Sequence, residues 1–284
     1  MSGSKTRDIN DYLNHISDLS DGELDLAKAS LSLAAVNSPD ISTEKYYYHI
    51  EKMVAATKAR YEEILKAGGN DDAGTQLAAL KHVLVEKNDY RGNDEEYDDL
   101  QNANLIRVIE RRKGLPIALA ILYVHVGQEA GFDVTALSFP AHVICRLEKD
   151  GERLLFDPFS SCKIMQAPDL RQLLKSLMGE HAELSTEFYN ISSKREMLVR
   201  LQNNIKLRQV EGEDYEGALQ TVETLQKIDP SEYRLSLDAG VLNARAGRLN
   251  RAVKELEHYI DHEKDDAHRR DAAAFLQQIR LNLT

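Results

Sequence analysis

The carboxyl-terminal part of the chain contains an internal repeat with a period of 34 residues. Segment 214–230 aligns with segment 248–264, and the alignment brings small and apolar residues together in four pairs: Ala218 with Ala252, Val222 with Leu256, Leu225 with Tyr259, and Tyr215 with Leu249. A short repeat of this kind cannot bury its apolar face alone and is stable only when it stacks on a neighbouring copy. The period therefore restricts residues 195–284 to an all-α stack of helix–turn–helix units.

Glycines occur where paired helices of the repeat would approach each other closely or turn, and a proline occurs where the first unit would end. Gly240 and Gly247 fall in the first helix and the turn of the second unit, and Asp229-Pro230 ends the first unit. Together with the period, these positions resemble tetratricopeptide repeats. Lys206 departs from the pattern, because it stands where the first unit would have glycine. The third unit is incomplete, and we expect helix 267–281 to cap the stack with a polar outer face.

Residues 21–190 have a different pattern. Apolar residues recur with helical spacing up to the run 114–131, which is too continuous for a surface helix and predicts a buried central helix. Three short strand-like segments follow, at 133–140, 142–148 and 153–159. Asp150-Gly151, between the last two segments, is a strong hairpin signal. Helices followed by consecutive antiparallel strands predict an α+β domain, with a helical region packed on a small antiparallel sheet.

Length and charge narrow the class of protein. A chain of 284 residues suggests two domains, and we expect a flexible polar segment at 1–20, an α+β domain at 21–190 and a helical domain at 195–284. The net charge of -11 disfavours a nucleic-acid partner. No apolar run approaches the roughly 20 residues of a membrane-spanning helix, and the amino terminus lacks the apolar centre of a signal peptide. We therefore expect a soluble, cytoplasmic protein without a membrane partner.

Both cysteines of the chain lie close to a histidine and an aspartate in segment 139–162. If His142 is on a strand, it faces away from Cys145, because neighbouring side chains alternate, and Cys145 is then a core residue. Asp157 follows across the hairpin, where a carboxylate could hold the imidazole in one tautomer. Cys162, in the next loop, could reach back to His142 as a nucleophile or could be a surface or half-buried thiol.

Several motifs occur in an order known from one protein superfamily. They are "RRKGLPIALAILYVHVGQEAG", "FPAH" and "FDPF", preceded by "YRGN" and followed by the repeats. The combination resembles the transglutaminase-like superfamily and, more closely, the bacterial family named for an invasion-gene regulator, over residues 25–284. The resemblance implies a papain-like core of helices and sheet. It also implies that His142 and Asp157 match the histidine and aspartate of a Cys-His-Asp triad.

The nucleophile of that triad is missing from its expected place. Enzymes of the superfamily carry Gly-x-Cys at the start of the buried helix, where this chain has Gly114-Leu115-Pro116. Proline suits the first turn of a helix, but it has no nucleophilic atom and no N–H to donate to an oxyanion. The triad chemistry therefore cannot run on Pro116.

The loop 88–104 supplies a second group of polar residues. With the start of the buried helix, it gives the candidates for a ligand cleft beside His142: Arg91, Asn93, Tyr97, Asn102 and Pro116. Arg91 or Arg111 could bind a ligand carboxylate. Alternatively, the asparagines hold the loop onto the central helix through hydrogen bonds to the backbone.

We expect neither a metal site nor a cofactor. His258 and His262 are four residues apart on one helix, a spacing that can bind metal, but no third ligand is in register. A solvated pair of histidines is the simpler interpretation.

Two functions follow from this pattern. The first is a non-catalytic regulatory or interaction protein, in which the cleft at His142 and Asp157 binds a small molecule or peptide and the repeats bind a protein or peptide. The alternative is a cysteine-dependent amide hydrolase or acyl transferase with Cys162 as nucleophile, His142 as base and Asp157 as orienter. A hydrolase that uses His142, Asp157 and an activated water is a third, least specified hypothesis.

Overall fold

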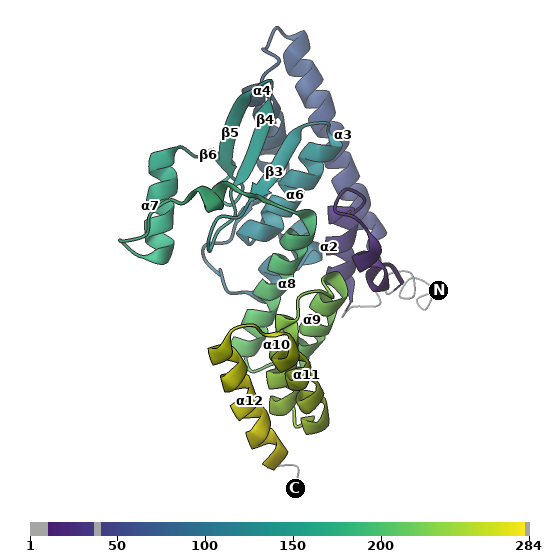
Figure 1. Cartoon of the computed structure of the whole chain (residues 1–284). Coiled ribbons are helices and arrows are strands. Elements are labelled where there is room, and N and C mark those ends of the chain that lie inside the picture. Colours follow the sequence, from purple (N-terminus) through teal and green to yellow (C-terminus); the bar gives the residue numbers. More distant parts are fainter. Residues whose placement is uncertain (1–10, 37–40, 282–284) are drawn as a thin grey trace. The chain divides into compact units, whose positions relative to one another are not determined.

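The computed structural model describes residues 11–36 and 41–281 of the chain, and these form two compact units. The first unit comprises residues 11–12, 21–36 and 41–198, and the second comprises residues 13–20 and 199–281. Figure 1 labels their elements. An α+β unit is followed by an all-α unit, which confirms the predicted fold class.

The helices of the first unit include one that is almost completely buried, as the apolar run predicted. In chain order they are α2 (Leu26–Ala35), α3 (Glu44–Lys66), α4 (Ala73–Lys81) with a π-helical continuation (His82–Lys87), α5 (Leu105–Arg111), α6 (Pro116–Glu129) and α7 (Ala167–Met178). Every residue of α6 from Pro116 to Gly127 is buried. This helix contacts α3 on one side and strands of the sheet on another, so it forms the centre of the unit.

The sheet is antiparallel and five-stranded, in the order β6-β5-β4-β3-β7. Its strands are β3 (Asp133–Leu137), β4 (Cys145–Lys149), β5 (Glu152–Asp157), β6 (Lys163–Ile164) and β7 (Ile191–Ser192). The predicted hairpin is confirmed: Lys149 pairs with Glu152, and Asp150 and Gly151 both have positive φ, as a two-residue turn of this type requires. A separate parallel pair joins β1 (Arg91–Gly92) to β2 (Lys113–Gly114).

One strand begins later than the sequence predicted. We expected residues 142–148 to be extended with His142 on the strand, but β4 starts at Cys145 and His142 lies in the preceding loop. Pro140 lacks a backbone N–H for a ladder, and Ala141 has a φ of 54°, so the chain leaves the extended conformation here. The alternation argument for His142 was therefore wrong, although Cys145 is fully buried as expected.

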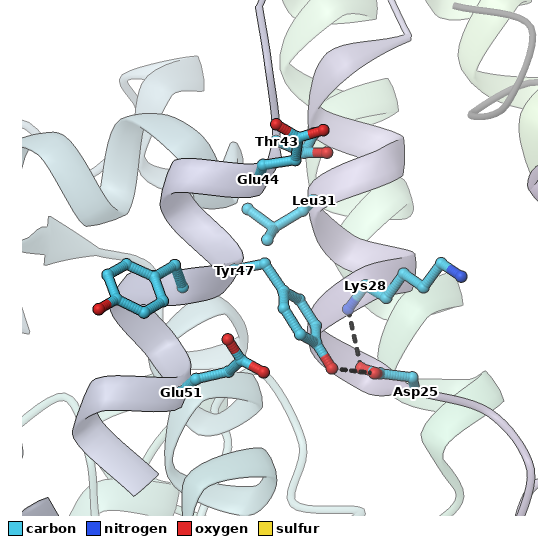
Figure 2. A pocket seen from close by; sticks show the side chains of 8 residues that line it. Asp25, Lys28, Leu31, Thr43, Glu44, Tyr47 and Glu51 are labelled. Atoms are coloured by element: carbon cyan, nitrogen blue, oxygen red, sulfur yellow. Dashed lines mark hydrogen bonds between the residues drawn. The ribbon is translucent and has the colours of Figure 1, made fainter. Parts of the chain in front are cut away.

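Side chains tie α2 to α3 near the start of both helices (Figure 2). Asp25 is the N-cap of α2 and accepts a hydrogen bond from the Lys28 backbone N–H at 2.9 Å. The Tyr47 hydroxyl on α3 donates to the same carboxylate at 2.6 Å. One carboxylate therefore both caps a helix and fixes its neighbour.

The second unit has the expected helical repeat. Its helices are α8 (Lys194–Glu211), which begins in the first unit, α9 (Tyr215–Ile228), α10 (Arg234–Arg245), α11 (Leu249–His262) and α12 (Asp266–Leu281). Ala218 and Ala252, equivalent in the two repeats, are both fully buried. A Cβ added at Gly240 would lie 2.7 Å from Leu256 Cγ, which shows why this position is small. Lys206, at the equivalent position of the first repeat, forms an ion pair with Asp238 on α10.

The amino-terminal segment is only partly within the described residues. We expected residues 1–20 to be flexible, and residues 1–10 lie outside the described residues. Leu13 and Ile16 are buried, and a short 3-10 helix (Ile16–Asp18) contacts α9. Apolar burial against the first repeat, which the polar composition concealed, orders this part of the segment.

Two further 3-10 helices lie at Leu100–Ala103 and Thr186–Tyr189. Within residues 11–36 and 41–281, no helix has both the length and the apolar composition needed to cross a membrane.

The contact between α6 and β3 requires glycine at position 127. A methyl group there would lie 2.5 Å from Val134 Cγ2 and 3.0 Å from its Cβ, and the Cβ is fixed to the strand backbone. We predict that Gly127→Ala lowers the free energy of unfolding by about 1–3 kcal/mol in urea denaturation. Gly22→Ala is the control, because nothing lies within 4 Å of its added methyl group. Equal midpoints for the two variants would contradict this close packing.

Candidate functional site

The structure brings His142 and Asp157 together in the interior of the first unit. His142 Nε2 lies 2.9 Å from Asp157 Oδ1, and the two side chains are 7% and 3% exposed. His142 comes from the loop before β4, and Asp157 is the last residue of β5. A carboxylate at this distance fixes the orientation of the imidazole ring.

Asp157 also closes the turn that follows it. Its Oδ1 accepts the Phe159 backbone N–H at 2.9 Å, and its Oδ2 accepts the Ser160 hydroxyl at 2.7 Å. Burial by itself raises the pKa of Asp157, but the bonds from His142, Ser160 and Phe159 outweigh it, so the pKa lies below its ordinary value. The carboxylate therefore orients the histidine and caps the turn at once.

Phe159 connects the histidine to the neighbouring loop. Its ring meets the His142 ring edge-on at 5.7 Å between centroids and the Tyr97 ring at 5.9 Å. Its backbone oxygen accepts the Gly92 N–H, and a Cβ at Gly92 would lie 2.6 Å from the Phe159 ring. We did not select Phe159 from the sequence, although its place after Asp-Pro in the "FDPF" motif was a usable signal.

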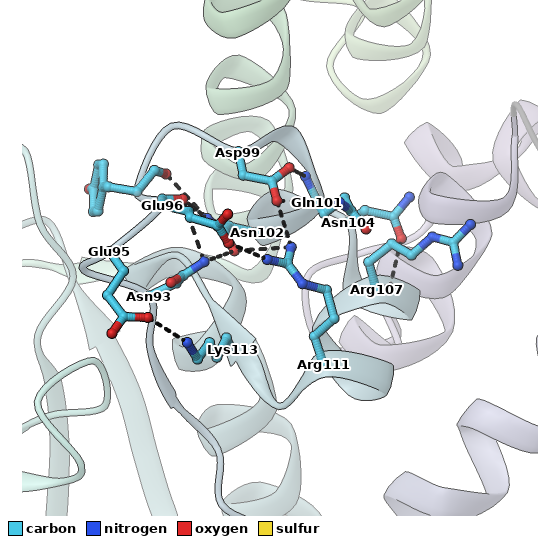
Figure 3. A network of polar contacts seen from close by, with 11 residues as sticks. Asn93, Glu95, Glu96, Asp99, Gln101, Asn102, Asn104, Arg107, Arg111 and Lys113 are labelled. Atoms are coloured by element: carbon cyan, nitrogen blue, oxygen red, sulfur yellow. Dashed lines mark hydrogen bonds and ion pairs between the residues drawn. The ribbon is translucent and has the colours of Figure 1, made fainter.

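The asparagines of the loop are engaged in holding it together (Figure 3). Asn93 and Asn102 are buried, and Asn93 Nδ2 donates to Asn102 Oδ1 at 3.0 Å. Asn102 Nδ2 donates to the Glu96 backbone oxygen at 2.6 Å, and the Asn102 backbone oxygen accepts the Leu115 N–H. These bonds fasten the loop to the residue that precedes α6, which is the alternative that we weighed for these side chains.

The two arginines considered for ligand binding already have acidic partners. Arg111 forms ion pairs with Glu96 at 3.2 Å and with Asp99 at 2.9 Å, both in the same loop (Figure 3). Arg91 is half exposed and pairs with Asp89 at 3.2 Å. Of the ligand-cleft candidates, Tyr97 and Arg91 are thus exposed to solvent, whereas Asn93 and Asn102 are buried.

Pro116 is the first residue of α6 and is buried. Leu115 precedes it as the N-cap and supplies no side-chain cap. The segment 113–116 is held beside the Phe159 turn through Gly92, which pairs with Gly114 in the β1–β2 ladder. The start of α6 is therefore linked to the turn at Phe159. The residue at this start, Pro116, has a chemically inert ring.

Neither cysteine has the surroundings of a nucleophile. Cys162 is 2% exposed, and burial raises the pKa of its thiol to about 12. The polar groups that act on it come from Lys81, Tyr123 and Asp157. Burial also raises the pKa of Cys145. Reactive cysteines need a lowered pKa and access to solvent, and these two have neither.

The arrangement places an imidazole that could act as a base beside a carboxylate that orients it. Among the residues that the structure describes, no three His, Cys, Asp or Glu side chains gather in a group that could hold a metal ion. The buried His142 ring, the buried Asp157 carboxylate and the turn after β5 form one hydrogen-bonded network, which joins the loop before β4 to the end of β5.

The hydrogen bonds to the ionised Asp157 carboxylate predict a pH-dependent contribution to the free energy of unfolding. Because the folded pKa of Asp157 is below the unfolded value of about 3.9, the contribution is complete above that pH and is lost as the pH falls through the folded pKa. We expect Asp157→Asn to lower the free energy of unfolding by about 1.5–3 kcal/mol at pH 7 and by clearly less near pH 3. Urea denaturation at both pH values measures this.

The exposed aspartate at the start of β3 provides the control, since Asp133→Asn should change stability by less than about 0.5 kcal/mol at either pH. An equal loss for Asp157→Asn at pH 7 and pH 3 would mean that the ionised carboxylate is not the stabilising species.

Comparison with known proteins places the chain in a family. The sequence model described as transglutaminase-like superfamily matches residues 44–203, which is more than half of the chain, and the one described as tetratricopeptide repeat matches residues 205–277. No solved structure matches the chain.

Curated bacterial relatives align over most of the chain. A UPF0162 protein of Xylella fastidiosa is 27% identical over 250 residues, 87% of each chain. A UPF0162 protein of Vibrio cholerae is 25% identical over 86% of this chain and 88% of its own. Protein SirB1 of Salmonella typhimurium is 24% identical over 80% of this chain and 82% of its own. The chain therefore belongs to the transglutaminase-like superfamily, and a tetratricopeptide-repeat region follows its transglutaminase-like domain.

Proposed function

We propose that this protein is a pseudoenzyme, a non-catalytic regulatory or interaction protein built on a transglutaminase-like domain. The observation that carries the proposal is Pro116 at the first position of α6, where enzymes of the superfamily place their cysteine. His142 and Asp157 keep the geometry of a base and its orienter, but no thiol at the helix start can use them. In this proposal, the His142–Asp157 pair has a structural role.

The alternative enzyme with Cys162 as nucleophile has less support. A thiol with a pKa of about 12 is almost entirely protonated at neutral pH. Cys162 also has a positive φ of 61°, which fixes it in a tight turn rather than in a loop free to approach His142. Both properties suit a packed residue of the interior.

The repeats supply the interaction surface in this proposal. Helical repeats of this type generally bind protein segments on the surface that the stack creates. On α8, Leu207 and Val210 are 54% and 37% exposed and stand three residues apart, so they lie on one face. We propose that this face takes an apolar residue of a partner's peptide.

Restoring the thiol tests the non-catalytic assignment. In the wild-type protein we expect iodoacetamide to label Cys145 and Cys162 negligibly at pH 7 in the folded state. In Pro116→Cys we expect one new thiol with a pKa clearly below that of the buried Cys162, because the helix amino terminus favours the thiolate and offsets burial. The shift should diminish when His142→Gln is added. Pro116→Ala controls for folding without the proline.

Rapid, His142-dependent labelling of Cys162 in the wild-type protein would overturn the pseudoenzyme assignment in favour of the enzyme.

Peptide selection tests the repeat surface. Peptides of 12 residues from a random phage-displayed library would be selected on the full chain and their affinities measured by fluorescence polarisation. We expect Leu207→Asp to weaken the selected peptides by at least about tenfold. Leu177→Asp, at a leucine of α7 that is 41% exposed, should leave them unchanged. Peptides that are indifferent to Leu207→Asp would argue against this face.

A further inference from the structure

The first unit contains a pocket whose lining includes neither His142 nor Asp157. The pocket has a volume of about 530 Å³ and lies between α2 and α3 (Figure 2). Asp25 and Lys28 line it from α2, and Glu44, Tyr47, Tyr48 and Glu51 line it from α3. Nothing in the superfamily assignment or in the proposed function uses these residues.

The helical period explains how α3 builds its wall. Glu44, Tyr47, Tyr48 and Glu51 are spaced i, i+3, i+4 and i+7, so they form one stripe along the helix. The stripe alternates a carboxylate, two aromatic rings and a carboxylate. Such a wall offers both charge and flat apolar surface to a bound group.

Asp25 at the end of the pocket is held rigidly. Tyr47 Oη donates to Oδ2 at 2.6 Å and the Lys28 N–H donates to Oδ1 at 2.9 Å. Behind it lies His125 of α6, which is 7% exposed and whose Nδ1 is 3.7 Å from Asp25 Oδ1, beyond hydrogen-bond length. No described residue gives the His125 ring a hydrogen bond.

The field in the pocket is negative. Burial, the bond to Asp25, and the charges of Asp25, Glu51 and Glu129 all raise the pKa of Tyr47 well above its ordinary value. Burial lowers the pKa of His125 although Asp25 and Glu129 oppose it, so the ring adds no positive charge at neutral pH. The Lys28 ammonium is directed elsewhere, with its Nζ 4.6 Å from the centroid of the Tyr12 ring.

The aromatic part of the wall already attracts an ammonium group of the same chain. Tyr48 is 58% exposed, and Lys52 Nζ lies 4.5 Å from its ring centroid. A cation at this distance is attracted to the face of the ring. Glu51 forms no ion pair with any residue in the described part of the chain, so its charge is available to a ligand.

We propose that this pocket binds a primary alkylammonium group, with the carboxylates of Asp25 and Glu51 around the charge and the tyrosine rings beside the alkyl stem. Two sources carry this chemistry: the lysine side chain of a partner's peptide and a free polyamine. The proposal is independent of whether the His142 site is catalytic.

Titration of the full-length chain with three probes tests the proposal. N-acetyl-lysine methylamide represents a peptide lysine, spermidine represents a free polyamine, and N-acetyl-norleucine methylamide is the uncharged control. Binding is followed by chemical-shift changes of backbone amides in the ¹⁵N-labelled protein at low salt. We expect saturable shifts at the start of α2 and along residues 44–51 with at least one amine, and none with the norleucine compound.

Charge-neutral variants locate the binding. Glu51→Gln should weaken the amine by about fivefold, because it removes one of the facing carboxylates. Glu62→Gln removes the same charge from an exposed position of α3, 11 residues or about 16 Å further along the helix, and should change the affinity less than twofold. Both side chains are exposed, so both variants should fold.

Saturation by spermidine alone supports the polyamine, and saturation by the lysine compound alone supports the peptide. The proposal is overturned if neither amine saturates below about 10 mM, a limit weaker than ordinary specific sites. Equal shifts from the norleucine compound, or equal effects of Glu51→Gln and Glu62→Gln, would also overturn it.

Discussion

The burial of α6 is the constraint on which the rest of the α+β unit depends. A helix that is apolar on all sides has no stable place at the surface, so α3 and the sheet must cover it. Gly127 permits the close approach of β3, and Tyr123 packs on Phe156 of β5 with ring centroids 5.5 Å apart. Because the helix is fixed along its length, its first residue, Pro116, is fixed as well. Pro116, at the position where the resemblance to the superfamily leads one to expect a cysteine, is therefore held at the buried start of α6.

The carboxylate of Asp157 has a structural role that does not depend on catalysis. It receives the His142 ring, the Ser160 hydroxyl and the Phe159 N–H, so its removal would leave three donors without their acceptor. In an enzyme, the same bonds would orient a base. In this chain they close the turn after β5 and seat Phe159 against Gly92. One carboxylate can orient a base and hold a turn at the same time, which is why geometry of this kind is weak evidence for activity.

Patterns that depend on neighbours in sequence predicted their elements well. The hairpin at Asp150-Gly151, the buried helix and the 34-residue repeat all follow from local backbone preference or from periodicity. Patterns that depend on distant contacts did not. His142 left the predicted strand because Pro140 and the positive φ of Ala141 end it early, and Cys162 is more deeply buried than its loop position suggested. The ordering of Ile16 against α9 had no signal in a polar segment.

The sequence by itself determined the fold class, the repeat and the proline that opens the buried helix, because each depends on residue type and spacing. Only the tertiary structure decided what the polar residues do, because an asparagine or an arginine has no function until its partners are known. It showed that Asn102 is bonded within its own loop and that Arg111 of α5 is paired with acidic residues of that loop. It also brought Asp25 and Glu51, which are 26 residues apart, to one pocket. Helix packing creates such a hollow, and no periodicity along a single helix records it.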